Sequence, residues 1–186
     1  MRIKLPFTDL QPPMELTRNE ERGWILEGDK RILSFRVKTF QALVNRLTSM
    51  AGSMVSATLL FQMGREIGET AFKYSKDSAM ADVLVKVFDS VLIDRGWGRC
   101  LKVERGKDTE TTYVFTIAEC PLCYELKQTE PICHLMGGLV TGWIEAFQGI
   151  KARQTLETAC AAVGDKFCVF EVSFHWQYAV SLDTLG

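Results

Sequence analysis

Histidine is scarce in this sequence, and neither sign of charge is in excess. Two histidines are few for catalysis by imidazole groups, and 22 lysines and arginines nearly balance 23 aspartates and glutamates. A balanced chain offers no basic surface for a phosphate backbone. We therefore expect no direct nucleic-acid binding and no histidine-based active site.

Long hydrophobic runs are also missing, although 47 % of the residues are hydrophobic. The longest apolar-rich stretch, residues 79–93, is interrupted by Asp82, Lys86 and Asp89, so no transmembrane segment is expected there. The first residues lack the apolar core and the cleavage site of a secretory signal. We expect a cytoplasmic protein, in which clustered cysteines more often bind metal or perform redox chemistry than form disulfides.

Motifs for catalysis do not stand out either. No glycine-rich dinucleotide fingerprint follows a predicted strand, and no acid–base pair is recognisable. Glu119 and His134 are the only polar groups near the cysteines that could handle protons. The sequence therefore leaves enzymatic activity uncertain and favours a protein that is not an enzyme.

The pattern of apolar residues predicts an α+β fold. A short hairpin with a Gly28-Asp29 turn is expected after an extended arm over residues 1–22. From Phe40 to Ala71, apolar and small residues recur in steps of three and four, which is typical of one helical stripe. Gly52-Ser53 could break this stretch into two helices. The stripe either faces the core or forms a dimer seam.

Further elements follow in the order helix, two strands, helix, two strands. The expected ranges are 79–93, 100–104, 111–118, 131–148, 150–156 and 167–177. This order predicts an antiparallel β-sheet packed against several α-helices. We divide the chain into an N-terminal arm and hairpin, residues 1–34, and a single globular ligand-binding domain, residues 35–186.

Five of the six cysteines lie in the last third of the chain: Cys120, Cys123, Cys133, Cys160 and Cys168. If the last hairpin turns at Gly164, Cys160 and Cys168 face each other with β-carbons about 4.5–5.5 Å apart. Two thiolates at that spacing can share one zinc ion, although a disulfide or a reduced buried pair is the alternative. Cys133 begins a predicted helix, whose positive end favours a thiolate.

Glu157 completes a closed set of four donors with Cys133, Cys160 and Cys168, which suits a structural zinc site more than a catalytic one. Because side chains alternate along a strand, Glu157 reaches the same metal as Cys160 only through a local bend. The Cys120-Pro-Leu-Cys123 knuckle is a competitor. Its two cysteines could replace Glu157 or Cys133, or bind a second metal.

These residues resemble the 4-vinyl reductase domain family. The matching motifs are Cys133-x-x-x-Gly-Gly-x-x-x-Gly142, Glu157-x-x-Cys160, Gly164-Asp165 and Cys168-x-Phe170, within a resemblance that spans residues 35 to 175. The family shares its fold with subunits of the TRAPP trafficking complex and with haem-based nitric oxide sensor domains. The resemblance implies a commonly dimeric α+β fold with an apolar pocket between sheet and helices.

The resemblance also implies a zinc ion held by Cys133, Glu157, Cys160 and Cys168, as in the sensor relatives. Members serve as ligand-sensing domains of aromatic-responsive transcription activators, or are linked to bacteriochlorophyll synthesis. The described motifs include neither an ATPase module nor a DNA-binding helix-turn-helix, which a complete activator needs.

The expected function is binding or sensing of a small apolar or aromatic ligand, in a homodimer with a structural zinc. Six residues are candidates to line the ligand, although each could be plain core packing: Phe61, Trp97, Tyr113, Phe115, Trp143 and Phe170. One alternative is an accessory protein or reductase acting on the vinyl group of a tetrapyrrole. Another is an interaction protein that assembles through the stripe at residues 40–71.

Overall fold

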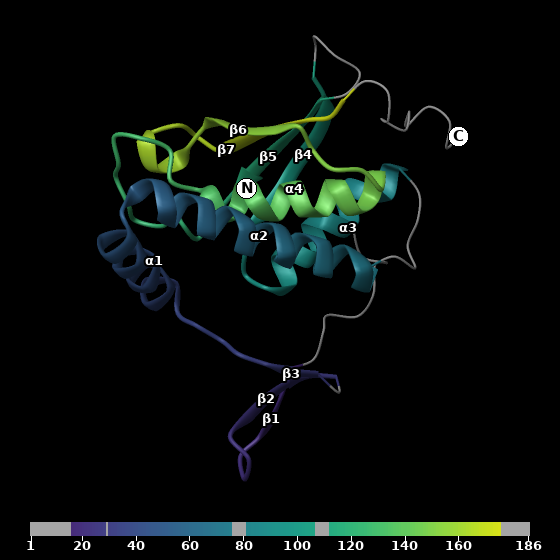
Figure 1. Ribbon diagram of the computed structural model, residues 1–186. Coiled ribbons are helices and arrows are strands. Elements are labelled where there is room, and N and C mark those ends of the chain that lie inside the picture. The colour runs from purple at the N-terminus through teal and green to yellow at the C-terminus, as the bar shows by residue number, and fades with distance from the viewer. Residues whose placement is uncertain (1–15, 29, 76–80, 107–111, 176–186) are drawn as a thin grey trace, which may run out of the picture. The chain divides into compact units, whose positions relative to one another are not determined.

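The computed structural model describes residues 16–28, 30–75, 81–106 and 112–175 (Figure 1). The chain divides into two compact units, residues 1–36 and 37–186. Within the described residues, no helix combines the length and the hydrophobicity that a membrane crossing requires.

The first unit contains a small antiparallel sheet of β1 (Leu16–Asn19), β2 (Trp24–Glu27) and β3 (Lys30–Ile32), in that order. The predicted hairpin is β2–β3, in which Glu27 pairs with Lys30 and Gly28 has a φ of 61°. The guanidinium groups of Arg22 and Arg31 lie 4.9 and 5.1 Å from the ring centre of Trp24. Residues 16–19 of the predicted arm form a strand, and residues 1–15 lie outside the described part.

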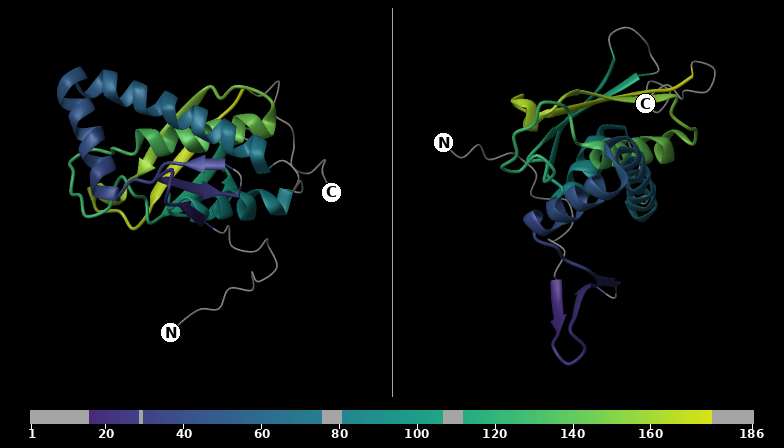
Figure 2. Two further views of the ribbon diagram at one scale, coloured as in Figure 1. Left: turned by 90° about the horizontal axis from the view of Figure 1, so that it is seen from below. Right: turned by 60° about the vertical axis from the view of Figure 1, so that its left-hand side comes forward.

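The second unit is a four-stranded antiparallel sheet with helices on one face (Figures 1 and 2). The strands are β4 (Arg99–Arg105), β5 (Thr112–Ala118), β6 (Gln154–Ala159) and β7 (Cys168–Ser173), in the order β4-β5-β7-β6. The helices are α1 (Val37–Ala51), α2 (Ser53–Ser75), α3 (Ala81–Asp94) and α4 (His134–Gln148), with a short 3-10 turn η1 (Ala161–Val163). The predicted α+β class is confirmed.

Helix α4 runs beneath the sheet, and α2 lies along the side of α4 that faces away from the sheet (Figures 1 and 2). Glycines make this contact close. A β-carbon added at Gly64 or Gly68 of α2 would overlap the backbone of α4, and one at Gly138 or Gly142 would overlap the backbone of α2. The predicted close approach at these glycines is therefore present, and each helix provides half of it.

A buried ion pair also joins the two helices. Arg65 of α2 donates from Nε to Glu145 Oε2 at 2.6 Å and from its terminal nitrogen to Oε1 at 2.8 Å. Glu145 Oε1 further accepts the Ala152 N–H at 2.7 Å. This bond holds the chain after α4 out of the sheet, so β6 begins at Gln154 and not at residue 150 as expected.

The long stripe predicted from Phe40 to Ala71 is broken and changes direction at Gly52. Gly52 has a φ of 82° and separates α1 from α2. Beyond the break, Gly64 and Gly68 are buried, whereas Met50 and Met54 on either side of it are 73 % and 82 % exposed. The stripe therefore faces the core only along the second part of α2.

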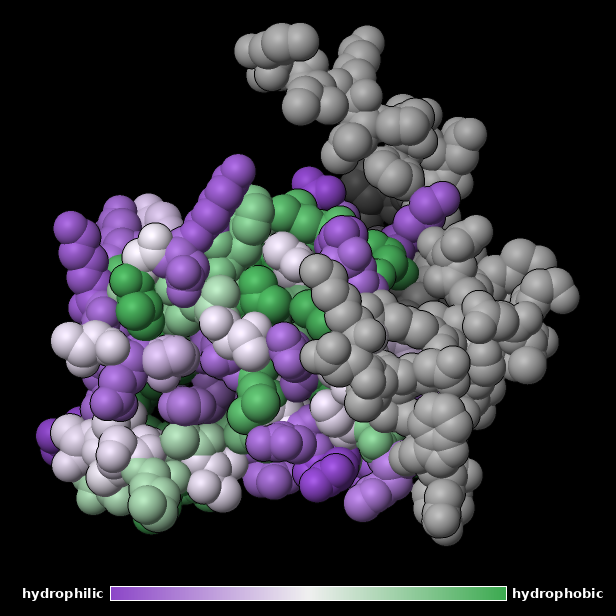
Figure 3. Space-filling view, turned by 90° about the horizontal axis from the view of Figure 1, so that it is seen from above, coloured by the Kyte–Doolittle hydropathy of each residue, from purple (hydrophilic) through white to green (hydrophobic). Residues whose placement is uncertain are grey.

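The hydrophobic core lies between the sheet and α4. Alternate residues of β5 and β7 point inward and are buried, as the strand pattern predicted: Tyr113, Phe115, Ile117, Cys168, Phe170 and Val172. Figure 3 looks onto the opposite face of the sheet, where hydrophobic and hydrophilic residues are interspersed. Leu101 and Leu156 remain about half exposed on their strands.

Candidate metal centre

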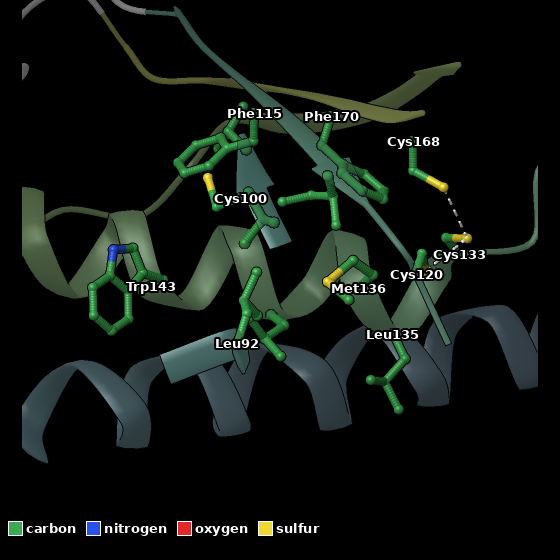
Figure 4. Close-up of a cluster of buried hydrophobic side chains, with 14 of the residues drawn as sticks. Leu92, Cys100, Phe115, Cys120, Cys133, Leu135, Met136, Trp143, Cys168 and Phe170 are labelled. Carbon is green, nitrogen blue, oxygen red and sulfur yellow. Dashed lines mark hydrogen bonds between the residues drawn. The ribbon is translucent and has the colours of Figure 1, made fainter. Parts of the chain in front are cut away.

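Five buried cysteines converge at one end of the core, beside the start of α4 (Figure 4). They come from four separate segments. Cys120 and Cys123 lie in the turn that follows β5, Cys133 directly precedes α4, Cys160 follows β6, and Cys168 is the first residue of β7. All six cysteines of the chain are free thiols, and the sixth, Cys100, lies apart on β4.

The sulfur atoms of this group, the thiol cluster, are in mutual contact. Cys133 Sγ lies 3.6 Å from Cys120 Sγ and 3.0 Å from Cys123 Sγ. It also lies 3.9 Å from Cys160 Sγ and 3.8 Å from Cys168 Sγ. Cys123 Sγ is 3.7 Å from Cys160 Sγ and 3.5 Å from Cys168 Sγ. Cys133 is therefore at the centre of the cluster.

Glu157 reaches the cluster through the local bend that the sequence required. The register of β6 against β7 shifts between Glu157 and Ala159. Glu157 Oε2 accepts the backbone N–H of Cys133 at 3.0 Å. Its Oε1 is buried and has no hydrogen-bond partner among the residues that the structure describes.

The thiols and the carboxyl group shift one another's pKa. Burial, together with the adjacent Cys160, raises the pKa of Glu157 to about 9. Hydrogen bonding from Cys133 lowers the pKa of Cys160 to about 6. The pKa of Cys168 is lowered by its hydrogen bonds with Cys120, Cys123 and Cys133. Part of the cluster therefore favours the thiolate form that a metal needs.

The donor chemistry fits a soft, four-coordinate metal ion. Two sets of donor atoms each lie within 4.8 Å of one another: Cys120, Cys123, Cys133 and Cys168, and Cys133, Glu157, Cys160 and Cys168. Thiolates with at most one carboxylate form the ligand set of structural zinc sites. The four residues named from the sequence thus form one of the two sets, and the competing knuckle belongs to the other.

Backbone contacts hold the segments of the cluster in place. The turn at residues 120–123 is closed by a bond from the Cys123 N–H to the Cys120 carbonyl at 3.0 Å. Asp165 Oδ2 accepts the Cys160 N–H at 2.8 Å, which explains the Gly164-Asp165 motif because Gly164 has a φ of 114°. The Ala161 N–H lies 3.5 Å from Cys168 Sγ.

Sequence reasoning missed Gln41, a buried side chain of α1 that supports the knuckle. Its Nε2 donates to the carbonyl oxygens of Pro121 and Tyr124, at 3.0 and 2.9 Å. A polar residue inside an apolar stripe is the only signal the sequence offers, and it does not identify the partner. Glu119 and His134, the residues considered for proton transfer, are both exposed.

The six candidate ligand-lining residues lie in different environments. Four are fully buried in the core: Tyr113, Phe115, Trp143 and Phe170. Phe115 and Trp143 both pack on Phe88, with ring centres 5.7 and 5.0 Å apart. Figure 4 shows Trp143 at the end of the core opposite the cysteines. Phe61 and Trp97 are half-buried.

Trp97 borders a mainly apolar groove of about 280 Å³ between α2 and α3. Ile67, Ala71, Leu92 and Leu139 contribute to its walls, and Glu66, Thr70 and Arg95 supply its polar groups. Typical ligand pockets have volumes of about 300–1,000 Å³, so this groove suits a small molecule. Deeper in the core, the Nε1–H of Trp143 is buried without a hydrogen-bond partner among the described residues.

Comparison with solved structures places the fold among sensory and trafficking domains. The phenol-responsive sensory domain of the transcription activator PoxR, solved with phenol, has a TM-score of 0.68 at 19 % identity, over 85 % of this chain and 84 % of that one. A vinyl-4-reductase family protein from Methanocaldococcus jannaschii has a TM-score of 0.53 at 16 % identity, over 76 % and 83 %.

A third similar structure is subunit 3 of a trafficking protein particle complex from Naegleria fowleri, covalently bound to palmitic acid. Its TM-score is 0.53 at 19 % identity, over 78 % of this chain and 95 % of that one. No sequence among curated proteins matches this chain. Residues 113–174 match the family model of the 4-vinyl reductase domain. The resemblance inferred from the cysteine and glycine motifs is therefore confirmed, and the chain carries a 4-vinyl reductase domain over residues 113–174.

Proposed function

We propose that this chain binds or senses a small apolar or aromatic molecule, in a domain held together by a structural zinc ion. The observation that carries the ligand proposal is the buried, unpartnered Nε1–H of Trp143. A buried donor without a partner destabilises a protein by about 1–3 kcal/mol, which an acceptor atom of a ligand would offset. The ligand class is therefore an aromatic compound with an oxygen substituent.

Two further observations support this ligand class. The groove beside Trp97 is walled mainly by apolar side chains, and Leu139 on its wall lies one turn before Trp143 on α4. The fold is similar to that of a sensory domain whose ligand is phenol, which makes phenol the natural probe. Phe61, Tyr113, Phe115 and Phe170 are proposed to surround the ligand as aromatic walls.

The zinc proposal assigns Cys133, Cys160 and Cys168 as ligands, with the fourth position taken by Glu157 or by a knuckle cysteine. Four such donors close the coordination sphere, so the ion would supply structural stability and no reactive position. It would join the start of α4 to the last hairpin and so fix one wall of the core.

We also propose a homodimer. The first part of α2 exposes apolar side chains, at Met54, Val55, Leu59 and Met63, of which the last three repeat every four residues. An exposed apolar row of this kind on a helix is typical of an assembly surface. The second copy of the chain is the occupant proposed here.

Binding of phenol and of toluene, measured by titration calorimetry on the full chain and on Trp143→Phe, tests the ligand proposal. Phenylalanine keeps an aromatic ring but removes the N–H. We expect phenol to bind the unchanged chain and to lose roughly five- to tenfold in affinity in the variant, as one hydrogen bond predicts. Toluene, which lacks the oxygen, should lose far less.

Two outcomes contradict the proposal. The first is that neither phenol nor toluene binds the zinc-loaded chain. The second is that Trp143→Phe weakens phenol and toluene equally, because the indole N–H would then have no role in recognition. Circular dichroism of the variant checks that its fold is retained.

A further inference from the structure

Four sulfur atoms of the thiol cluster approach the corners of a tetrahedron. A zinc ion with four thiolates at about 2.3 Å needs its sulfur atoms about 3.8 Å apart. Cys133 Sγ is 3.9 and 3.8 Å from the sulfur atoms of Cys160 and Cys168. Cys123 Sγ is 3.7 and 3.5 Å from the same two. Cys160 and Cys168 lie within 4.8 Å of each other, and Cys123 and Cys133 are 3.0 Å apart.

The competing fourth donor, Glu157, already has a role. Its Oε2 accepts the backbone N–H of Cys133 at 3.0 Å, which orients a residue at the centre of the cluster. Carboxylates that hydrogen-bond to metal ligands in this way commonly fix those ligands from outside the coordination sphere. The free Oε1 is the strongest argument for Glu157 as a ligand, so the experiment must separate the two roles.

Cys123 is held in position by contacts from outside its own segment. Gln41, which is 5 % exposed, donates from α1 to the carbonyl oxygens of Pro121 and Tyr124, on either side of Cys123. The Cys123 N–H closes the turn to the Cys120 carbonyl. A buried amide bonded to both flanks of one thiol is a preorganised support for a ligand.

We propose that Cys123 supplies the fourth ligand, so that one soft metal ion, zinc, is bound by the four thiolates of Cys123, Cys133, Cys160 and Cys168. Glu157 then supports Cys133 from outside the coordination sphere, and Cys120 remains an uncoordinated thiol beside it. This assignment rests on the zinc ion of the proposed function.

The all-sulfur set changes what the ion holds together. With Glu157 as the fourth ligand, the metal joins only the start of α4 to the β6–β7 hairpin. With Cys123, it also fixes the turn after β5, and the Gln41 bonds extend that connection to α1. Four thiolates leave two net negative charges around a divalent ion and close its coordination sphere.

X-ray absorption at the zinc edge, recorded on the zinc-loaded full chain, tests the assignment directly. We expect a single shell of four sulfur atoms near about 2.3 Å and no oxygen shell near about 2.0–2.2 Å. Glu157→Gln should leave this shell unchanged, and Cys123→Ser should lose one sulfur. Cys120→Ser and Cys100→Ser are the matched cysteine controls, and both should retain four sulfur atoms.

Three sulfur atoms and one oxygen in the unchanged chain, with the oxygen altered in Glu157→Gln, would overturn the assignment. Four sulfur atoms in Cys123→Ser, or a sulfur lost in Cys120→Ser, would overturn it equally. The spectrum of the unchanged chain decides the question even if a variant fails to fold. A folded chain that binds no zinc contradicts the metal of the proposed function itself, which separates the two failures.

Discussion

Glu157 is the residue whose chemistry depends most on its surroundings. Its carboxyl group is half-buried beside three cysteine thiols, and its Oε2 is bonded to the backbone N–H of Cys133. Burial and the neighbouring Cys160 raise its pKa from 4.5 to about 9. In the metal-free protein, Glu157 therefore binds a proton that the unfolded chain has already released at neutral pH.

The metal-free chain should show this proton as a pH-dependent stability. Because the folded-state pKa is raised, the contribution of Glu157 is present below about pH 4.5 and is lost as the pH rises towards 9. The unfolding free energy of the unchanged chain, relative to Glu157→Gln, should fall across this window. Urea unfolding after chelation, at several pH values, measures the difference. A difference that stays constant or grows with pH would contradict the assigned environment.

At this scale the sequence predicted the residues of the cluster but not their supports. The cysteine spacings and the Glu157-x-x-Cys160 motif indicated which side chains meet, because strand alternation and a hairpin turn are local rules. The bend at Glu157 was recognised as a requirement, and the register shift beside it fulfils that requirement. The Gln41 bonds to the knuckle span about eighty positions, and no local pattern encodes them.

The pairing of α2 with α4 is the element-scale contact on which the site depends. Glycines on both helices allow the two backbones to touch, and the Arg65–Glu145 pair lies in the same interface. Because Cys133 directly precedes α4, the position of this helix also sets the position of the central sulfur.

Adjacent glycines of α4 offer a matched pair of substitutions. In Gly138→Ala, the new β-carbon would overlap the Phe61 carbonyl of α2, and overpacking of this kind typically destabilises by about 1–3 kcal/mol. In Gly137→Ala, it would meet the Phe170 ring at 3.5 Å, an ordinary contact. Alanine favours a helix over glycine by about 0.5–1 kcal/mol, so this variant should be neutral or more stable.

Thermal unfolding of both variants measures the difference. Equal melting temperatures for Gly138→Ala and Gly137→Ala would contradict the close approach of the two helices. A melting temperature below that of the unchanged chain for Gly138→Ala alone is the expected outcome.

At the element scale, the sequence predicted the order of helices and strands and the break at Gly52. It misplaced the start of β6, because the Ala152 N–H is bonded to Glu145 on another element and the pattern of side chains does not reveal such a bond. It also treated the stripe of residues 40–71 as one face. Gly52 changes the direction of the chain, so Met54 is exposed while Gly64 is buried.

For the whole molecule, the exposed row on α2 bears on the oligomeric state. Met54 is 82 % exposed and Leu59 is 45 % exposed, on the helix whose other side packs against α4. Apolar side chains in such a row leave water when a second copy covers them.

Light scattering on size-exclusion fractions tests the homodimer. The unchanged chain should have twice its monomer mass of 21.0 kDa. Leu59→Asp should shift it to the monomer, because a carboxylate buried in an apolar interface is strongly unfavourable. Asn45→Asp, at an exposed polar position of α1, is the control and should remain dimeric. A folded monomer for the unchanged chain would remove the dimer from the proposal.

The central claim is that the converging thiols hold one structural zinc ion. Metal content by mass spectrometry, on protein purified without added metal, tests it most directly when combined with thermal unfolding before and after chelation. The account predicts about one zinc per chain, a lower melting temperature once the ion is removed, and loss of the ion in Cys160→Ser and Cys168→Ser but not in Cys100→Ser. A folded chain without metal, or zinc retained in Cys168→Ser, would contradict it.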